Sequence, residues 1–233
     1  MFQPIVDLHT LEVHRAEALL RWEHPIRGDI PPDVFISIAE RTGRIGDLGD
    51  IAFDASVAAL LLLRQTDPTF QIAVNLSPVE LREPGPRHLD RIARLRSAGL
   101  PGAALIIEIT EGVLLTSDDV VDANLLEYRN AGMQFAIDDF GTGYSSLSYL
   151  QRLDVQFLKI DRSFIDGLAP GSDGLALCQA IIVMAHKLGL GVVAEGVETE
   201  EQNLLLMQSG CDFAQGYLHA RPMTVDALAG QSI

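Results

Sequence analysis

Polar side chains recur at or near the carboxyl ends of the apolar segments of this chain. Five are carboxylates, joined by two amides and one amine: Glu17, Glu108, Asp138, Asp139 and Glu195, then Asn75 and Gln215, then Lys159. Five uncompensated negative charges in one place would repel one another and be driven toward protonation. Two divalent ions with Lys159 would supply five positive charges, and hard oxygen ligands suit Mg²⁺ or Mn²⁺ rather than zinc. The charge balance therefore predicts a site for two divalent ions.

Such a pair of ions, about 3.5 to 4 Å apart, clamps a phosphoryl group and lowers the pKa of a bound water, which points to hydrolysis. Lys159 could orient the attacking water, stabilise developing negative charge, or accept a proton if its pKa were depressed. The sequence leaves these three roles open. The Gly-rich residues 140–146 follow the paired aspartates and could bring backbone close to a ligand, although this signal is weak by itself.

Each of these residues also has an ordinary structural interpretation. A single acidic residue at a strand end is more often a helix cap or a salt-bridge partner than a metal ligand. Lys159 alone would be a snorkelling surface lysine, Asn75 a turn residue, and Arg21 the partner of a neighbouring carboxylate. The joint occurrence of the carboxylates favours function.

The elements that must position these side chains alternate along the chain. Apolar segments rich in Val, Ile and Leu predict eight strands, at residues 3–8, 13–22, 71–76, 104–109, 134–137, 156–160, 191–194 and 212–217. A short polar turn separates the first two, which we expect to pair. Helical stretches separate the others.

Strands buried on both faces should be continuously apolar, as these segments are apart from their charged ends. The fold class predicted is α/β, a (β/α)8 TIM-type barrel, in which the carboxyl ends of the strands face one shared mouth. An open doubly wound sheet stays possible from alternation alone, but the usual GxGxxG opening is absent. At 233 residues, 1–233 is expected to form a single domain.

The bulk composition excludes several function classes. A net charge of −15 argues against binding a DNA or RNA polymer through simple electrostatics. The sequence shows no signal peptide and no membrane-spanning run, so we expect no membrane contact. Cys178 and Cys211 lack CxxC spacing, which fits a cytoplasmic setting. The chain begins almost inside its first strand, so we hypothesise that it is a fragment of a longer protein.

The segment Glu17-Ala18-Leu19, followed by Leu20-Arg21-Trp22, resembles the signature of EAL domains, the bacterial phosphodiesterases that hydrolyse the second messenger cyclic di-GMP. Other segments resemble the same family along the whole chain: FQPIVDL, VNLS, EITE, DDFGTGYSSL, LKIDRSFI, AEGVET and QGYL. Such a joint match is highly specific.

The resemblance implies a barrel with an antiparallel first strand pair, two Mg²⁺ or Mn²⁺ ions, and hydrolysis of cyclic di-GMP to linear 5′-pGpG by a metal-activated water. It assigns roles to matching residues: Glu17, Asn75, Glu108 and Asp138 as ligands of one ion; Asp138, Asp139 and Glu195 around the second; Lys159 in positioning the water, with Glu17 and Glu195 also catalytic; Arg21 and Gln215 in substrate binding; Glu111 and Glu198 in supporting the active-site loop. It also implies a possible homodimer and attached regulatory domains, commonly GGDEF, PAS or receiver domains.

Two alternatives come from other functional classes. A binding module would sense cyclic di-GMP without cleaving it, and an interaction domain would only regulate attached or partner proteins. The first would be favoured by lost ligands and the second by an eroded DDFGTG loop. Neither loss is visible in the sequence.

Overall fold

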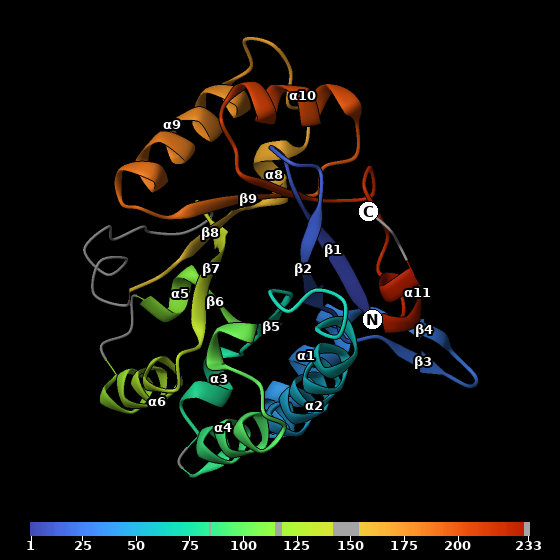
Figure 1. Cartoon of the computed structure of the whole chain (residues 1–233), viewed down its shortest axis with the longest axis vertical. Coiled ribbons are helices and arrows are strands. Elements are labelled where there is room, and N and C mark those ends of the chain that lie inside the picture. The colour runs from blue at the N-terminus through green and yellow to red at the C-terminus, as the bar shows by residue number, and fades with distance from the viewer. Residues whose placement is uncertain (84, 115–117, 142–153, 231–233) are drawn as a thin grey trace.

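Eight strands close into a barrel in the computed structural model, which describes residues 1–83, 85–114, 118–141 and 154–230 (Figure 1). The barrel strands are β1 (Phe2–Asp7), β2 (Val13–Ala18), β5 (Gln71–Asn75), β6 (Leu105–Thr110), β7 (Gln134–Phe140), β8 (Phe157–Ile160), β9 (Gly191–Glu195) and β10 (Phe213–Gln215). Their order around the barrel is β1-β10-β9-β8-β7-β6-β5-β2, and β1 pairs with β2 to close it. The predicted eight-stranded barrel is confirmed.

Strand β1 runs against the direction of the others. It pairs antiparallel with both β2 and β10, whereas the remaining neighbours pair in parallel. In the β1–β2 register, Phe2 lies opposite Ala18 and Gln3 opposite Glu17. The predicted antiparallel first pair is therefore confirmed. At the mouth where the other strands end, β1 begins.

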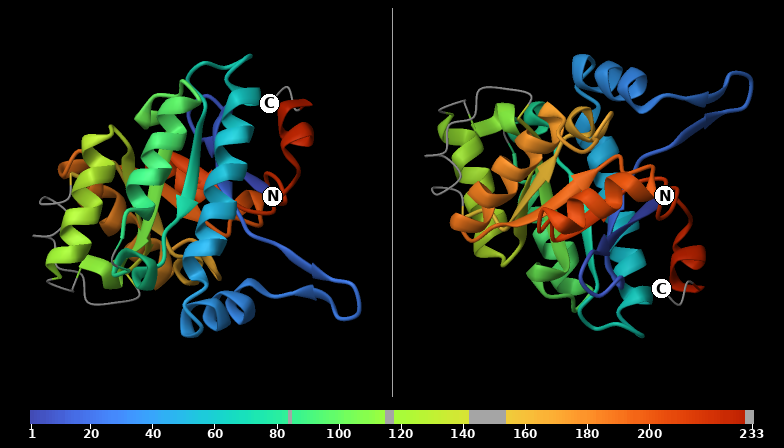
Figure 2. Two further views of the ribbon diagram at one scale, coloured as in Figure 1. Left: turned by 90° about the horizontal axis from the view of Figure 1, so that it is seen from below. Right: turned by 90° about the horizontal axis from the view of Figure 1, so that it is seen from above.

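Several barrel strands are almost continuously apolar because both of their faces are covered. In β6, five consecutive residues are buried. Helices pack around the outside of the barrel, among them α2 (Ile45–Leu63), α4 (Arg87–Ser97), α6 (Asp119–Asn130), α9 (Asp173–Lys187) and α10 (Glu200–Gln208) (Figure 2). The other helical elements are α1 (Pro32–Arg41), α3 (Pro78–Leu81), α5 (Glu111–Leu114), α8 (Arg162–Ile165), α11 (Val225–Gly230) and the 3₁₀ turn η1 (Gly102–Ala104). In the described ranges, no helix combines the length and apolar character needed to cross a bilayer.

The second predicted strand, residues 13–22, is longer than the observed β2, which ends at Ala18. Its pairing with β5 stops at Ala18, and Trp22 instead opens a separate hairpin of β3 (Trp22–His24) and β4 (Gly28–Ile30). Figure 2 shows this hairpin extending away from the barrel. Trp22 packs edge to face against Phe35 of α1, with ring centroids 5.9 Å apart. The apolar residues between Ala18 and Trp22 look like strand in the sequence, but the barrel ladder has already ended.

A buried ion-pair network joins α2, α3 and α4 outside the barrel. Glu80 of α3 pairs with Arg91 of α4, and their exposed fractions are only 7% and 3%. Both side chains press against Gly49 of α2, where an added Cβ would lie 2.5 Å from Arg91 and 2.6 Å from Glu80. Burial outweighs the attraction to Arg91 and raises the pKa of Glu80 to about 7. The carboxyl is thus held partly as the neutral acid.

Replacing Glu80 with glutamine should reduce the pH dependence of stability. Because the folded pKa lies above the ordinary value of 4.5, the contribution of Glu80 is fully present below pH 4.5 and is lost as the pH rises through 7. From pH 4.5 to 8, the unfolding free energy of the wild type relative to Glu80→Gln should fall by about 3 kcal/mol. Urea unfolding across this range measures it, with Glu83→Gln at the rim of the network as the control. A difference in unfolding free energy between wild type and Glu80→Gln that stays the same at every pH would contradict the expectation.

Candidate active site

The side chain of Lys159 lies at the centre of the barrel mouth. It is the penultimate residue of β8, is 1% exposed, and faces four carboxylates from four other strands. Its Nζ atom lies 2.6 Å from Glu195, 3.0 Å from Glu108, 3.1 Å from Asp138 and 3.4 Å from Glu17. Burial opposes the charge of the ammonium, but these carboxylates hold the pKa of Lys159 well above its ordinary value. One positive charge thus partly compensates four acidic groups.

Two amide side chains hold the carboxylate of Glu17. Asn75 Nδ2 donates to Oε1 at 2.6 Å, and Gln215 Nε2 donates to Oε2 at 2.7 Å. Burial alone would raise the pKa of Glu17, but Lys159 and these donors lower it below its ordinary value. Burial and the neighbouring charge of Glu17 instead raise the pKa of Glu108 well above its usual range. The pKa values of the two buried carboxyls are therefore shifted in opposite directions.

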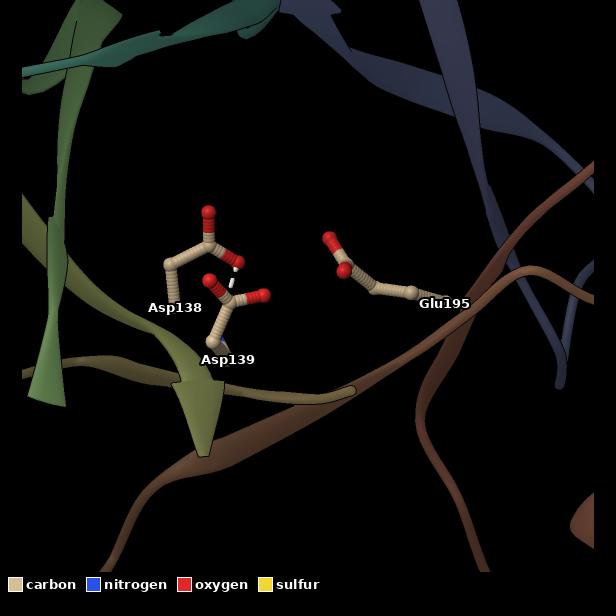
Figure 3. Close-up of side chains that lie close together, drawn as sticks. All are labelled: Asp138, Asp139 and Glu195. Carbon is tan, nitrogen blue, oxygen red and sulfur yellow. Dashed lines mark hydrogen bonds between the residues drawn. The ribbon is translucent and has the colours of Figure 1, made fainter. Parts of the chain in front are cut away.

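Three carboxylates form a second group beside the lysine. One oxygen from each of Asp138, Asp139 and Glu195 lies within 4.8 Å of the other two (Figure 3). Adjacent residues on a regular strand point to opposite faces. Here the β7–β8 register shifts between Ile137 and Phe140, and Asp139 adopts φ of +53°. This local irregularity places both aspartates facing Glu195.

The group opens into a cleft of about 280 Å³. Its lining includes members of the cluster and residues from the following loops: Gln3, Glu17, Leu19, Asp138, Lys159, Arg162, Glu195, Gly196, Glu198, Gln215, Gly216 and Tyr217. Burial raises the pKa of Glu195 to about 8, despite Lys159. Burial and the charge of Asp138 also raise the pKa of Asp139. A ligand entering the cleft would meet more carboxylates than the single ammonium of Lys159 can neutralise.

These residues fit hard divalent cations. Glu108 Oε2 is buried and lies 3.0 Å from the Lys159 ammonium, yet it accepts no well-directed hydrogen bond from the described part of the chain. The available donors are carboxylate and amide oxygens, which Mg²⁺ and Mn²⁺ prefer. The closely spaced oxygens of Asp138, Asp139 and Glu195 could hold a metal ion.

The remaining predicted site residues are not part of this cluster. Glu111 is buried, and its Oε2 accepts a hydrogen bond from the Gly141 amide at 3.2 Å, which ties α5 to the end of β7. Glu198 pairs with Arg162 at 2.9 Å on the rim of the cleft. Arg21 is exposed, and its Nη1 donates to the Leu20 carbonyl at 2.8 Å, outside the cleft lining. Of the Gly-rich loop, residues 142–146 lie outside the described residues.

Two polar residues near the cluster were not predicted from the sequence. Gln3 is buried and accepts a hydrogen bond from Gln215 Nε2 at 3.3 Å. Gln3 was not predicted because only the carboxyl ends of strands were expected at the mouth, whereas the reversed β1 brings its amino end there. Asp161 follows β8, and its side chain contacts that of Asp139 and raises the pKa of that group. Its spacing of two residues from Lys159 was the available signal.

Substituting alanine for Gly196 should disturb the rim of the cleft. Gly196 has φ of +70°, and an added Cβ would lie 2.5 Å from Arg162 Cγ. We expect a loss of about 2 kcal/mol in unfolding free energy from backbone strain and this clash. Gly210→Ala is the matched control, because Gly210 has φ of +80° and nothing within 4 Å of the added atom. Chemical denaturation of both variants checks this, and equal losses would show that the contact with Arg162 is unimportant.

The fold and site together define an α/β barrel with a cluster of carboxylates, suited to binding cations, at the carboxyl ends of its strands. The family model described as "EAL domain" matches residues 1–222. The chain therefore belongs to the EAL domain family, as its motifs predicted.

Named relatives and solved structures agree with this membership. The chain is 42% identical over 229 residues to the cyclic di-GMP phosphodiesterase NbdA of Pseudomonas aeruginosa, covering 97% of this chain and 29% of that protein. It is 43% identical over 228 residues to the bifunctional diguanylate cyclase/cyclic di-GMP phosphodiesterase MucR of the same species, covering 97% and 33%. The solved PaMucR phosphodiesterase in complex with c-di-GMP has a TM-score of 0.90 and 41% identity, covering 97% of this chain and 92% of that one. This chain thus spans about a third or less of these two curated relatives.

Proposed function

We propose that this domain hydrolyses cyclic di-GMP to linear 5′-pGpG in a reaction that depends on divalent metal ions. The observation that carries the proposal is the buried Lys159, surrounded at the barrel mouth by carboxylates from four other strands. Relatives about 40% identical are named cyclic di-GMP phosphodiesterases, and one similar structure was solved with c-di-GMP. These relationships support cyclic di-GMP as the substrate.

The proposed ligands fall into two sets that share one aspartate. Glu17, Asn75, Glu108 and Asp138 would hold one Mg²⁺ or Mn²⁺ ion, and Asp138, Asp139 and Glu195 would surround the second. The Nδ2 atom of Asn75 already donates a hydrogen bond to Glu17, which leaves the amide oxygen of Asn75 as the ligand atom. When bound, the ions would offset charge on the phosphate and lower the pKa of a nearby water.

Lys159 is proposed to position the attacking water and to stabilise negative charge on the phosphate. The surrounding carboxylates hold its pKa well above the ordinary value, so its ammonium is a hydrogen-bond donor in this cluster. This favours orientation and charge stabilisation over proton acceptance. Lys159 thereby presents a fixed positive charge where the carboxylates of Glu17 and Glu195 converge.

Four more residues are proposed to serve the substrate or the surrounding loops. Gln215 lines the cleft beside Glu17 and is proposed as a substrate contact. The exposed Arg21, which follows β2, is proposed as a second substrate contact. Glu111 would steady the segment after Asp139 through Gly141, and Glu198 would hold Arg162 at the rim. A homodimer, attached regulatory domains and a cytoplasmic setting stay predictions.

An assay with purified protein tests the function directly. The protein is incubated with cyclic di-GMP and Mg²⁺ or Mn²⁺, and pGpG is followed by chromatography. We expect turnover that stops when EDTA removes the metal and returns when excess Mn²⁺ is added. Glu17→Ala and Lys159→Ala should lose turnover. Tight binding of cyclic di-GMP without cleavage would instead identify a receptor, and equal turnover in EDTA would contradict the role of metals.

A further inference from the structure

Gln3 is a buried polar residue at the barrel mouth to which the proposed reaction gives no role. Its exposed fraction is 8%, and it lies directly opposite Glu17 in the β1–β2 register. Figure 1 shows β1 and β2 side by side. The reversed direction of β1 therefore brings an uncharged amide beside the carboxylate cluster.

The hydrogen bonds of Gln3 fix which way its amide faces. Its Nε2 donates to the carbonyl oxygen of Ala220 at 3.1 Å. A carbonyl oxygen can only accept, so the nitrogen of Gln3 faces Ala220 and its oxygen faces Gln215. The Nε2 atom of Gln215 then donates to this oxygen at 3.3 Å and to Glu17 Oε2 at 2.7 Å. A continuous chain of bonds runs from the backbone to the Glu17 carboxylate.

This chain of bonds also fixes the amide of Gln215. Turning that amide over would place its oxygen against two acceptors, Gln3 Oε1 and Glu17 Oε2. In the observed orientation, Gln215 Oε1 is buried without a hydrogen-bond partner in the described residues. An unpaired buried oxygen is unfavourable. The two acceptors on the nitrogen side oppose reorientation, and Gln3 supplies one of them.

We infer that Gln3 is a positioning residue for the metal site, acting through Gln215 on the carboxylate of Glu17. The inference rests on the metal site of the proposed function. Residues that orient metal ligands from behind typically contribute a 10- to 100-fold effect on metal affinity when they are replaced. Gln3 is not among the proposed metal ligands and bonds to Glu17 only by way of Gln215, so its effect should require Gln215.

Direct Mn²⁺ binding to the whole domain, measured from the paramagnetic resonance signal of free Mn²⁺, provides a test independent of turnover. Gln3→Met keeps the length of the side chain but removes both hydrogen bonds, and it should weaken Mn²⁺ binding about tenfold. The matched control is Gln71→Met, because Gln71 donates to Ala103 O at 2.7 Å and to Gln134 at 2.6 Å at the opposite end of the barrel. The control should keep wild-type Mn²⁺ affinity. If Gln3→Met does not fold, the shorter amide in Gln3→Asn provides the same comparison.

A double-variant cycle separates positioning from a general loss of packing. In a Gln215→Ala background, Gln3→Met should weaken Mn²⁺ binding less than about twofold, since the intermediate amide is gone. A tenfold loss in both backgrounds, an unchanged affinity in Gln3→Met, or an equal loss in Gln71→Met would overturn the inference. A wild type that binds Mn²⁺ but leaves cyclic di-GMP intact would refute the proposed function alone. A wild type that binds no Mn²⁺ would refute both.

Discussion

Replacing Lys159 with methionine is expected to lower the unfolding free energy of the metal-free protein by about 3–5 kcal/mol at pH 8. The side chain is 1% exposed and supplies the positive charge within 3.4 Å of four carboxylates. Without it, these buried groups repel one another or must bind protons. The loss should therefore shrink toward pH 5, where the carboxyls become neutral more readily. Thermal and urea unfolding in EDTA measure it.

Two further measurements connect this stability effect to function. Saturating Mn²⁺ should restore much of the lost stability, because divalent ions compensate the same carboxylates. Turnover of cyclic di-GMP should nevertheless fall by about 10²–10³, because the ammonium is no longer present to orient the water. The control is Lys187→Met, which replaces the other lysine of the chain at the exposed end of α9. Unchanged stability of metal-free Lys159→Met would contradict the charge-compensation argument.

Replacing Glu108 with glutamine is expected to move stability and activity in opposite directions. Burial and the charges of Glu17, Asp138 and Glu195 raise the pKa of Glu108 well above its ordinary value. A neutral amide relieves this repulsion, so the metal-free variant should be more stable by about 1–2 kcal/mol at pH 8. The folded pKa is raised, so the ionised carboxyl becomes more destabilising as the pH rises, and the gain should shrink toward pH 4.5. Denaturant unfolding in EDTA at several pH values measures the gain.

The same variant should lose catalysis because a proposed ligand oxygen is gone. Turnover at a fixed Mn²⁺ concentration should fall by about 10²-fold, and stabilisation by added Mn²⁺ should be much smaller than in the wild type. Glu127→Gln, on the exposed face of α6, is the matched control and should change neither quantity. A Glu108→Gln protein that is less stable without metal would show that the ionised carboxylate contributes more through Lys159 than it costs through repulsion.

Much of the barrel could be predicted because its strands are defined by local composition. Segments such as residues 104–109 and 191–194 are apolar, short and separated by helical stretches, and each coincides closely with an observed strand, β6 and β9. Local sequence also defines the start of α10, where Thr199 and Gln202 form a capping box. The β3–β4 hairpin was not predicted, because the apolar character of residues 19–22 continues past the point where barrel pairing ends.

The sequence alone determined which side chains could do chemistry. The carboxylates, Asn75, Lys159 and Gln215 are recognisable from residue type, from their places at strand ends and from the motifs that surround them. The rule that parallel strands share a mouth was enough to expect convergence of residues as distant as Glu17 and Glu195. The structure places both within 3.4 Å of the Lys159 ammonium.

Only the tertiary structure decided how these groups are held. The positive φ of Asp139 and the shifted β7–β8 register bring carboxylate oxygens of two neighbouring aspartates within 4.8 Å of Glu195, which a regular strand would not do. Both Glu17 and Glu108 are buried, yet their pKa values shift in opposite directions, because Lys159 and two amides stabilise the Glu17 carboxylate whereas the charge of Glu17 repels that of Glu108. Gln3 reaches the mouth because β1 is reversed, and strand direction arises from pairing between segments distant in the chain. Residue types are local properties, whereas direction, burial and register exist only once the barrel closes.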